Sequence, residues 1–108
     1  IESVTQELAL KALELFKQIE DGGGFIKQLL QGDIQKKIKE SASKQQALFD
    51  IGSITLLGTN KHPNPMDLMK ENLELFPFLK SNPRKTLIQP IIAKRLAEAI
   101  EQQRLAHE

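Results

Sequence analysis

The chain has 108 residues, with fifteen Lys and Arg against fourteen Asp and Glu, so its formal net charge is +1. A chain of this length forms about one domain. The near-neutral charge gives no attraction to nucleic acid or to an anionic membrane, so we expect neither partner. Because it has no cysteine, disulfides, thiolate metal sites and a cysteine nucleophile are excluded. This composition fits a reducing compartment, and we expect the cytoplasm.

The composition, 40% hydrophobic and 27% charged, is typical of a globular chain. No apolar run approaches the roughly 20 residues that cross a bilayer. The sequence begins at Ile1, and its two methionines, Met66 and Met69, lie in the middle. Because a natural start is missing, we expect these residues to be a piece of a longer protein.

The first predicted element is an amphipathic helix of four to five turns that ends at Gly22–Gly24. Ser3 and Gln6 have the spacing of a capping box at its start. The three glycines also suggest a phosphate-binding loop, but no strand precedes them and no Gly-Lys-Ser/Thr follows, so a helix stop is favoured. The apolar face of this helix consists of Val4, Leu8, Ala12, Leu15, Phe16 and Ile19.

Two further helices follow. The pattern predicts a short helix over Phe25 to Gln31, stopped by Gly32. Asp33 is the expected N-cap of a third helix, which runs from Ile34 to near Gly52 with apolar residues at Ile38, Ala42 and Phe49. Its other face carries several lysines, three of them within four residues, which suits a solvated surface better than a phosphate or acidic partner.

The second half of the chain contains one expected strand, Ser53 to Thr59, whose edges would need a pairing partner. All five prolines lie between residues 61 and 90, and Met66 to Phe76 is predicted to form two or three helical turns. The last helix is predicted from about Pro90 to His107. Its expected inner face is Ile92, Leu96, Ala99, Ile100 and Gln103, with charge pairs outside among Lys94, Arg95, Glu98 and Glu101.

The expected fold class is therefore mainly α, with several amphipathic helices and one short β-strand or hairpin. We divide the chain into residues 1–60, a proline-rich connection at 61–90, and a C-terminal helix at 91–108.

The sequence supplies no set of residues for catalysis. Its two histidines, His62 and His107, have no metal-ligand spacing and no neighbouring nucleophile. Acidic neighbours such as Glu20 and Asp21 do not face the same point on a helix, so no acid/base pair is evident. We therefore assign no catalytic, cofactor-binding or metal-binding residue.

Several ordered motifs resemble the adenosylcobalamin-dependent methylmalonyl-CoA mutases. They are Ile1-Glu2-Ser3-Val4-Thr5, Glu20-Asp-Gly-Gly-Gly-Phe-Ile26, Ala42 to Gly52, Leu57-Gly-Thr-Asn-Lys61 and Arg95-Leu-Ala-Glu-Ala-Ile-Glu-x-x-Arg104. The resemblance covers nearly the whole chain. It implies that residues 1–60 hold the last helix of a substrate barrel, a helical pair and a short strand. It also implies that residues 91–108 form the linker helix toward a cobalamin domain, so the chain is an excised part of a larger α/β barrel protein.

The family resemblance implies an isomerisation between methylmalonyl-CoA and succinyl-CoA, with adenosylcobalamin as the cofactor of the parent enzyme. The family's catalytic residues and its Asp-x-His-x-x-Gly cobalamin motif lie outside this chain. Asn60-Lys-His62-Pro-Asn-Pro65 is only a near-match to that motif, with Asn in place of Asp and Pro in place of Gly. No cofactor is therefore expected in the chain itself. The segment from Phe76 to Pro90, with Ala93-Lys-Arg-Leu-Ala-Glu98, is more similar to the small, noncatalytic subunit of heterodimeric mutases than to the large one.

Two hypotheses about function result. The chain is either a noncatalytic part of a mutase, in contact with the rest of the barrel and a partner mutase subunit, or a self-standing helical interaction module. In isolation we expect a homodimer, because the apolar face of the first helix and the unpaired strand would both seek a partner.

Overall fold

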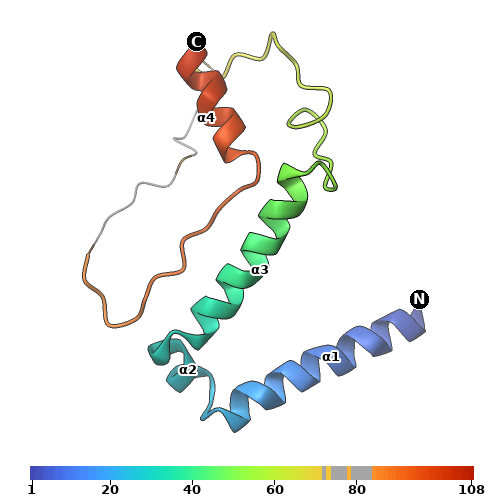
Figure 1. Ribbon diagram of the computed structural model, residues 1–108, viewed down its shortest axis with the longest axis vertical. Helices are drawn as coiled ribbons and strands as arrows, with labels where there is room; N and C mark the ends of the chain where they lie inside the picture. Colours follow the sequence, from blue (N-terminus) through green and yellow to red (C-terminus); the bar gives the residue numbers. More distant parts are fainter. Residues whose placement is uncertain (72, 74–77, 79–83) are drawn as a thin grey trace. The chain divides into compact units, whose positions relative to one another are not determined.

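The fold is mainly helical, as the sequence predicts. A computed structural model describes residues 1–71, 73, 78 and 84–108, and these contain four helices (Figure 1). They are α1 (Glu2–Asp21), α2 (Phe25–Gln31), α3 (Asp33–Asp50) and α4 (Glu98–His107). None of the helices in these residues is long and apolar enough to cross a membrane.

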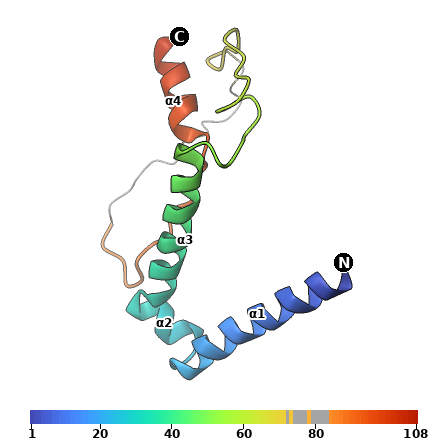
Figure 2. The same ribbon diagram turned by 45° about the vertical axis from the view of Figure 1, so that its right-hand side comes forward.

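The chain divides into two compact units. The first comprises residues 1–39 with 85–91, and the second comprises residues 40–84 with 92–108. The boundary falls inside α3, between Lys39 and Glu40. Figure 2 shows the short α2 between the end of α1 and the first turns of α3. Each unit is described by itself below.

The start of α1 differs from the predicted capping box. Ile1 takes the N-cap position, and no side chain caps the helix. The Ile1 carbonyl accepts hydrogen bonds from the backbone N–H of Thr5 at 3.0 Å and from its hydroxyl at 3.1 Å. Because the helix already begins at Glu2, Ser3 lies within its first turn and cannot act as the cap.

The end of α1 confirms the predicted glycine stop and shows which glycine is needed for which reason. Gly24 N donates to Ile19 O at 3.0 Å and Gly23 N donates to Glu20 O at 3.1 Å, the two bonds of a Schellman motif. Gly23 takes the left-handed angle that this motif requires, with φ of 104°. Gly22 has an ordinary φ of −78°, but a Cβ there would overlap the side-chain Nε2 of Gln28.

The corner between α2 and α3 also depends on a glycine. Gly32 ends α2 with a left-handed φ of 88°, and its carbonyl accepts from Lys36 N at 3.0 Å. Asp33 is therefore the first helical residue of α3, and its predicted role as N-cap is wrong by one position. Its carboxylate still lies in the first turn, where a negative charge suits the helix dipole.

Two glutamine side chains are buried in the first unit. Gln28 donates through Nε2 to Ile19 O at 3.3 Å. Gln35, only 1% exposed, donates through Nε2 to Leu29 O at 2.9 Å and to Gln89 O at 3.1 Å. One amide therefore joins the end of α2 to a segment 54 residues further along the chain.

In the second unit, the predicted strand is instead a series of turns. Within Ser53 to Thr59, the backbone pairing is a single bridge between Leu57 and Lys61. Asn60 provides the physical reason, because its side chain donates to Ile54 O at 2.7 Å and accepts from Leu56 N at 2.8 Å. With Gly58 at a φ of 79°, the backbone curls back on itself and leaves no extended edge to pair.

Two predicted helices are also corrected. Met66 to Glu71, the described start of the segment expected to be helical as far as Phe76, forms turns and irregular backbone. Residues 72 and 74–76 of that prediction lie outside the described part of the chain. The last helix begins at Glu98 instead of near Pro90, so Ile92 lies outside it and is exposed. Ile91 and Ile92 are exposed, so helical turns there would have no burial of these side chains to offset the cost of ordering the backbone.

We predict that Gln35→Ala lowers the free energy of unfolding by about 1–3 kcal/mol, because two carbonyls lose their donor and a cavity is left. Urea unfolding followed by circular dichroism at 222 nm measures the change. Gln45→Ala is the matched control, since Gln45 lies on the same helix and is exposed. Equal losses in the two variants would contradict the role assigned to Gln35.

Candidate functional site

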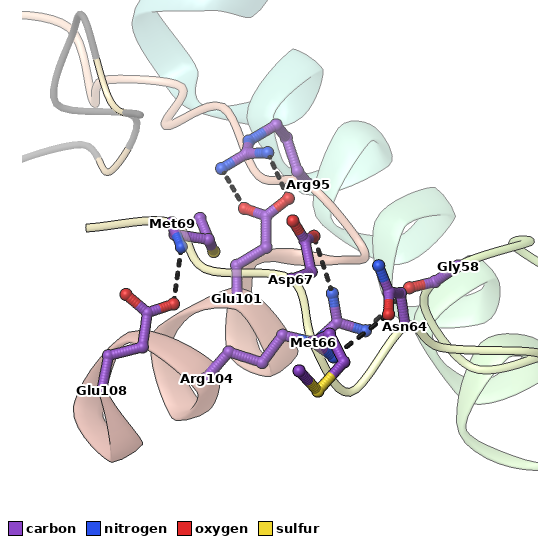
Figure 3. Close-up of polar contacts among 9 residues, drawn as sticks. All are labelled: Gly58, Asn64, Met66, Asp67, Met69, Arg95, Glu101, Arg104 and Glu108. Carbon is purple, nitrogen blue, oxygen red and sulfur yellow. Dashed lines mark hydrogen bonds and ion pairs between the residues drawn. The ribbon is translucent and has the colours of Figure 1, made fainter. Parts of the chain in front are cut away.

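The most structured feature of the second unit is an open groove between α4 and the loop that precedes residue 71. Its volume is about 370 Å³. Its lining residues are Asn64, Pro65, Asp67, Leu68, Ile100, Gln103, Arg104, His107 and Glu108. Figure 3 shows that charged side chains of α4 reach across to the backbone of this loop.

Arg104 makes the first of these contacts. Its Nη2 donates to Gly58 O at 2.7 Å, and its Nη1 lies 3.7 Å from Asp67 Oδ2. The carbonyl contact is the stronger one, because 3.7 Å is at the long end for an ion pair. A planar guanidinium can make both contacts at once, so Arg104 joins two parts of the loop to one turn of α4 (Figure 3).

Glu108 makes the second contact. Its two carboxylate oxygens accept hydrogen bonds from Met69 N at 2.6 Å and from Lys70 N at 2.7 Å. Two successive N–H groups that converge on one carboxylate have the geometry of a small anion-binding concavity. Here the chain's own carboxylate fills it, so these amides hold the loop instead of facing a ligand.

Arg95 and Glu101 form the third contact. Arg95 Nη1 donates to Glu101 Oε1 at 3.0 Å, and Nη2 lies 2.6 Å from Oε2. The hydrogen bond to this carboxylate raises the pKa of Arg95 above its ordinary value. The predicted charge pairs of a longer helix are replaced by this link, which connects the segment before α4 to its first turn.

The structure places the two histidines in different parts of the second unit, His62 in a turn and His107 at the end of α4. His62 is exposed and has a φ of 52° in a turn. Asn60, which would occupy the Asp position of a cobalamin-type motif, already uses its side-chain oxygen and nitrogen on Leu56 and Ile54. His107 is exposed and lines the groove. Within residues 1–71, 73, 78 and 84–108, no three His, Asp or Glu side chains gather as a metal site would require.

Sequence reasoning missed the residues that hold this groove together. Arg104 and Glu108 bind backbone groups 46 and 39 residues away, and no spacing in the sequence signals such a contact. What the arrangement does chemically is to fix a loop to a helix. It brings no nucleophile next to a base.

We predict that Glu108→Gln increases amide hydrogen exchange at Met69 and Lys70 several-fold, because a neutral amide accepts more weakly than a carboxylate. The change in global stability should stay below about 1 kcal/mol at such an exposed contact. Exchange followed by nuclear magnetic resonance measures both amides. Glu71→Gln removes an exposed carboxylate nearby and should leave them unchanged, so equal effects would count against the contact.

Comparison with protein families gives a match along almost the whole chain. The family model described as methylmalonyl-CoA mutase matches residues 1–105. Among solved structures, none matches this chain.

The curated relatives agree with the family model. A probable mitochondrial methylmalonyl-CoA mutase of Caenorhabditis elegans is 40% identical over 62 residues, which cover 57% of this chain and 8% of the relative. The methylmalonyl-CoA mutase large subunit of Propionibacterium freudenreichii subsp. shermanii is 35% identical over 74 residues, which cover 65% of this chain and 10% of the relative. The methylmalonyl-CoA mutase of Escherichia coli strain K12 is 27% identical over 95 residues, which cover 88% of this chain and 13% of the relative.

The chain thus spans 8–13% of the length of these three relatives. The family match extends over far more than half of its residues. It includes the glycine stop after α1 and the Asn60 turn, two features that the structure explains locally. The chain belongs to the methylmalonyl-CoA mutase family.

Proposed function

We propose that this chain is a noncatalytic structural part of a methylmalonyl-CoA mutase, which joins the substrate barrel to the cobalamin domain and contributes to subunit contacts. The observation that carries this proposal is the family match over residues 1–105. The groove at α4 supports it, because its charged residues are committed to backbone contacts within the chain. On this proposal the parent enzyme interconverts methylmalonyl-CoA and succinyl-CoA. This chain contributes to the structure of that enzyme and supplies no catalytic group.

The near-match at Asn60 to Pro65 does not fit adenosylcobalamin, the cofactor implied for the parent enzyme. A histidine that ligates a metal needs a second group to orient its ring. The near-match to the cobalamin motif offers Asn60 for that purpose, but both polar atoms of its side chain are already bonded to Ile54 and Leu56. No step of the reaction is therefore assigned to His62.

The structural role rests on how the two ends of the matched region are built. α1 has no buried residue and presents apolar side chains along its length, as a helix does when it packs on another part of a larger protein. Two polar links, from Arg104 on α4 and from Glu108 at its C-cap, fix the loop to the helix, and a third joins Arg95 to Glu101 of α4. We propose that the rest of the mutase barrel and a partner mutase subunit are the partners.

Two finer assignments belong to the same proposal. We assign the chain to the small subunit of a heterodimeric mutase, on the basis of residues 76–90 and the segment from Ala93 to Glu98. We place it in the cytoplasm, which suits a chain without cysteine.

The alternative function, a self-standing helical interaction module, is less well supported. Such a module needs a closed apolar core of its own. Among the described residues, the buried apolar side chains are Phe49 and Phe78, whereas most large apolar side chains of α1 are exposed.

A chimeric enzyme tests the proposal. We predict that replacing the corresponding region of the Cereibacter sphaeroides methylmalonyl-CoA mutase, which is 40% identical over 62 residues, with residues 1–105 of this chain retains isomerase activity. The expected loss in kcat is less than about tenfold, because no group that touches the reacting atoms is exchanged.

The control for this chimera is its affinity for adenosylcobalamin. Its soluble yield and helical content are measured as well, to show that it folds. A chimera that folds and binds the cofactor normally but has lost more than about 1,000-fold in kcat would contradict the proposal. That result would mean that the exchanged region contributes catalytic groups.

We also predict that the chain alone neither binds adenosylcobalamin nor isomerises methylmalonyl-CoA, because a radical reaction needs an enclosed cavity that this chain does not supply. Titration of the cofactor with the chain should leave its visible absorption spectrum unchanged. A spectral shift that disappears in His62→Ala would show that the near-match is a genuine ligand site.

A further inference from the structure

A continuous series of hydrogen bonds connects the end of α3 to α4 within the second unit. The series begins at Leu48, in the part of α3 that belongs to this unit. The Leu48 carbonyl accepts from Ser53 N at 2.9 Å and from Ile54 N at 3.2 Å. These two bonds attach the residues that follow α3 to the last turns of the helix itself.

The series continues through the Asn60 turn, which comprises Ile54 to Lys61. The Asn60 side chain donates to the Ile54 carbonyl at 2.7 Å and accepts from Leu56 N at 2.8 Å. Its backbone N–H also donates to the Leu56 carbonyl, at 3.2 Å, and Gly58 N donates to the Lys61 carbonyl at 2.8 Å. Asparagine is well suited to bonding nearby backbone groups in this way. One residue therefore makes three of the bonds that shape the turn.

The last bond of the series joins the turn to α4. Gly58 has a left-handed φ of 79°, which glycine adopts without strain. Its carbonyl accepts from Arg104 Nη2 at 2.7 Å (Figure 3). The Arg104 side chain is 23% exposed, so this charge-assisted bond is partly shielded from water. The Gly58 carbonyl is thus the point at which the Asn60 turn holds α4.

The other contact between α4 and the loop lies further along the chain. Glu108 accepts from Met69 N and Lys70 N, so it ties the end of α4 to residues that follow the Asn60 turn. The bonds from Leu48 to Ile54, from Ile54 to Asn60 and from Gly58 to Arg104 instead lead back to α3. The position of α4 relative to the end of α3 therefore depends on the turn.

We propose that Asn60 is a positioning residue for α4. It acts through Gly58, because it shapes the turn that presents the Gly58 carbonyl to Arg104, and it thereby ties α4 to the end of α3. This inference deepens the proposed function and rests on it for the role of the tie in a mutase. There the tie would fix the direction in which the linker helix leaves the barrel.

A distance between two spin labels tests this role in the 108-residue chain. The chain has no cysteine, so cysteines for nitroxide labels can be introduced at the exposed Gln45 of α3 and Gln102 of α4. Double electron–electron resonance measures the distribution of distances between them. Asn60→Ala should make this distribution about twofold wider or more, because α4 loses its fixed contact. Lys61→Ala is the matched control and should leave it unchanged, since Lys61 contributes its carbonyl to the turn and alanine keeps that group.

Arg104→Gln distinguishes positioning from a general loss of structure. It should widen the distribution as much as Asn60→Ala does, and the double variant should be no wider than either single variant, because both changes act on one bond. Circular dichroism at 222 nm should show equal helix content in all of them. If Asn60→Ala loses helix, Asn60→Asp replaces it, since the carboxylate still accepts from Leu56 N and lacks the donor to Ile54 O. An intermediate width is expected for that variant.

Three results would overturn the proposal. They are a wide distribution in the wild-type chain, a distribution that Asn60→Ala or Arg104→Gln leaves unchanged, and additive widening in the double variant. The readout is a distance and not isomerase activity, so failure of this test and failure of the mutase chimera are separate outcomes.

Discussion

The shape of the first unit depends on where helix-end carbonyls find their donors. The last carbonyls of any helix have no partner within it, and they must be satisfied by turns, side chains or water. At the end of α1, the Ile19 carbonyl accepts from Gly24 N at 3.0 Å and from Gln28 Nε2 at 3.3 Å. At the end of α2, the Leu29 carbonyl accepts from the buried Gln35 amide. The tight corner between the helices therefore depends on two amide side chains as much as on its glycines.

The second unit uses the same kind of contact with charged side chains in place of amides. Arg104 and Glu108 bind backbone groups of the loop, and Asn60 folds that loop onto itself. Charge-assisted bonds of this kind specify geometry well but contribute little net stability at an exposed position. Polar links thus set the arrangement within each unit, whereas burial of apolar side chains plays a small part.

The sequence predicted the features that depend on local physics. Periodicity located α1, α2 and α3 to within one or two residues, and the glycines at 22–24 and at Gly32 marked their ends correctly. The predictions that failed depend on contacts that hydrophobic periodicity does not show, some local and some distant. The apolar run from Ile54 to Leu57 suggests a strand, but Asn60 satisfies its backbone locally. The late start of α4 could not be predicted either, because periodicity alone does not show that Ile92 is largely exposed.

The groove was beyond sequence reasoning for a related reason. Bonds from Arg104 to Gly58 and from Glu108 to Met69 join side chains to backbone atoms. Backbone groups are alike in nearly all residues, so the sequence does not show which of them a side chain binds. The glutamines gave no signal either, since Gln35 lies beside the apolar stripe that was expected to be buried. The family motifs at Leu57 to Lys61 and at Arg95 to Arg104 did include parts of this region. They could do so because several motifs, each weakly specific, occur in the order typical of the family.

The distribution of polar and apolar side chains in this chain is the reverse of what a self-sufficient domain shows. Glutamines are buried at the corner of the first unit, while Leu8 and Phe16 on α1 are largely exposed. Covering roughly 400 Å² of such surface is worth on the order of 10 kcal/mol before the cost of association is subtracted. A stabilisation of that size is comparable to the whole stability of a small domain, commonly about 5–15 kcal/mol. Covering the exposed apolar side of α1 would therefore contribute, before that cost, a free energy comparable to the whole stability of such a domain.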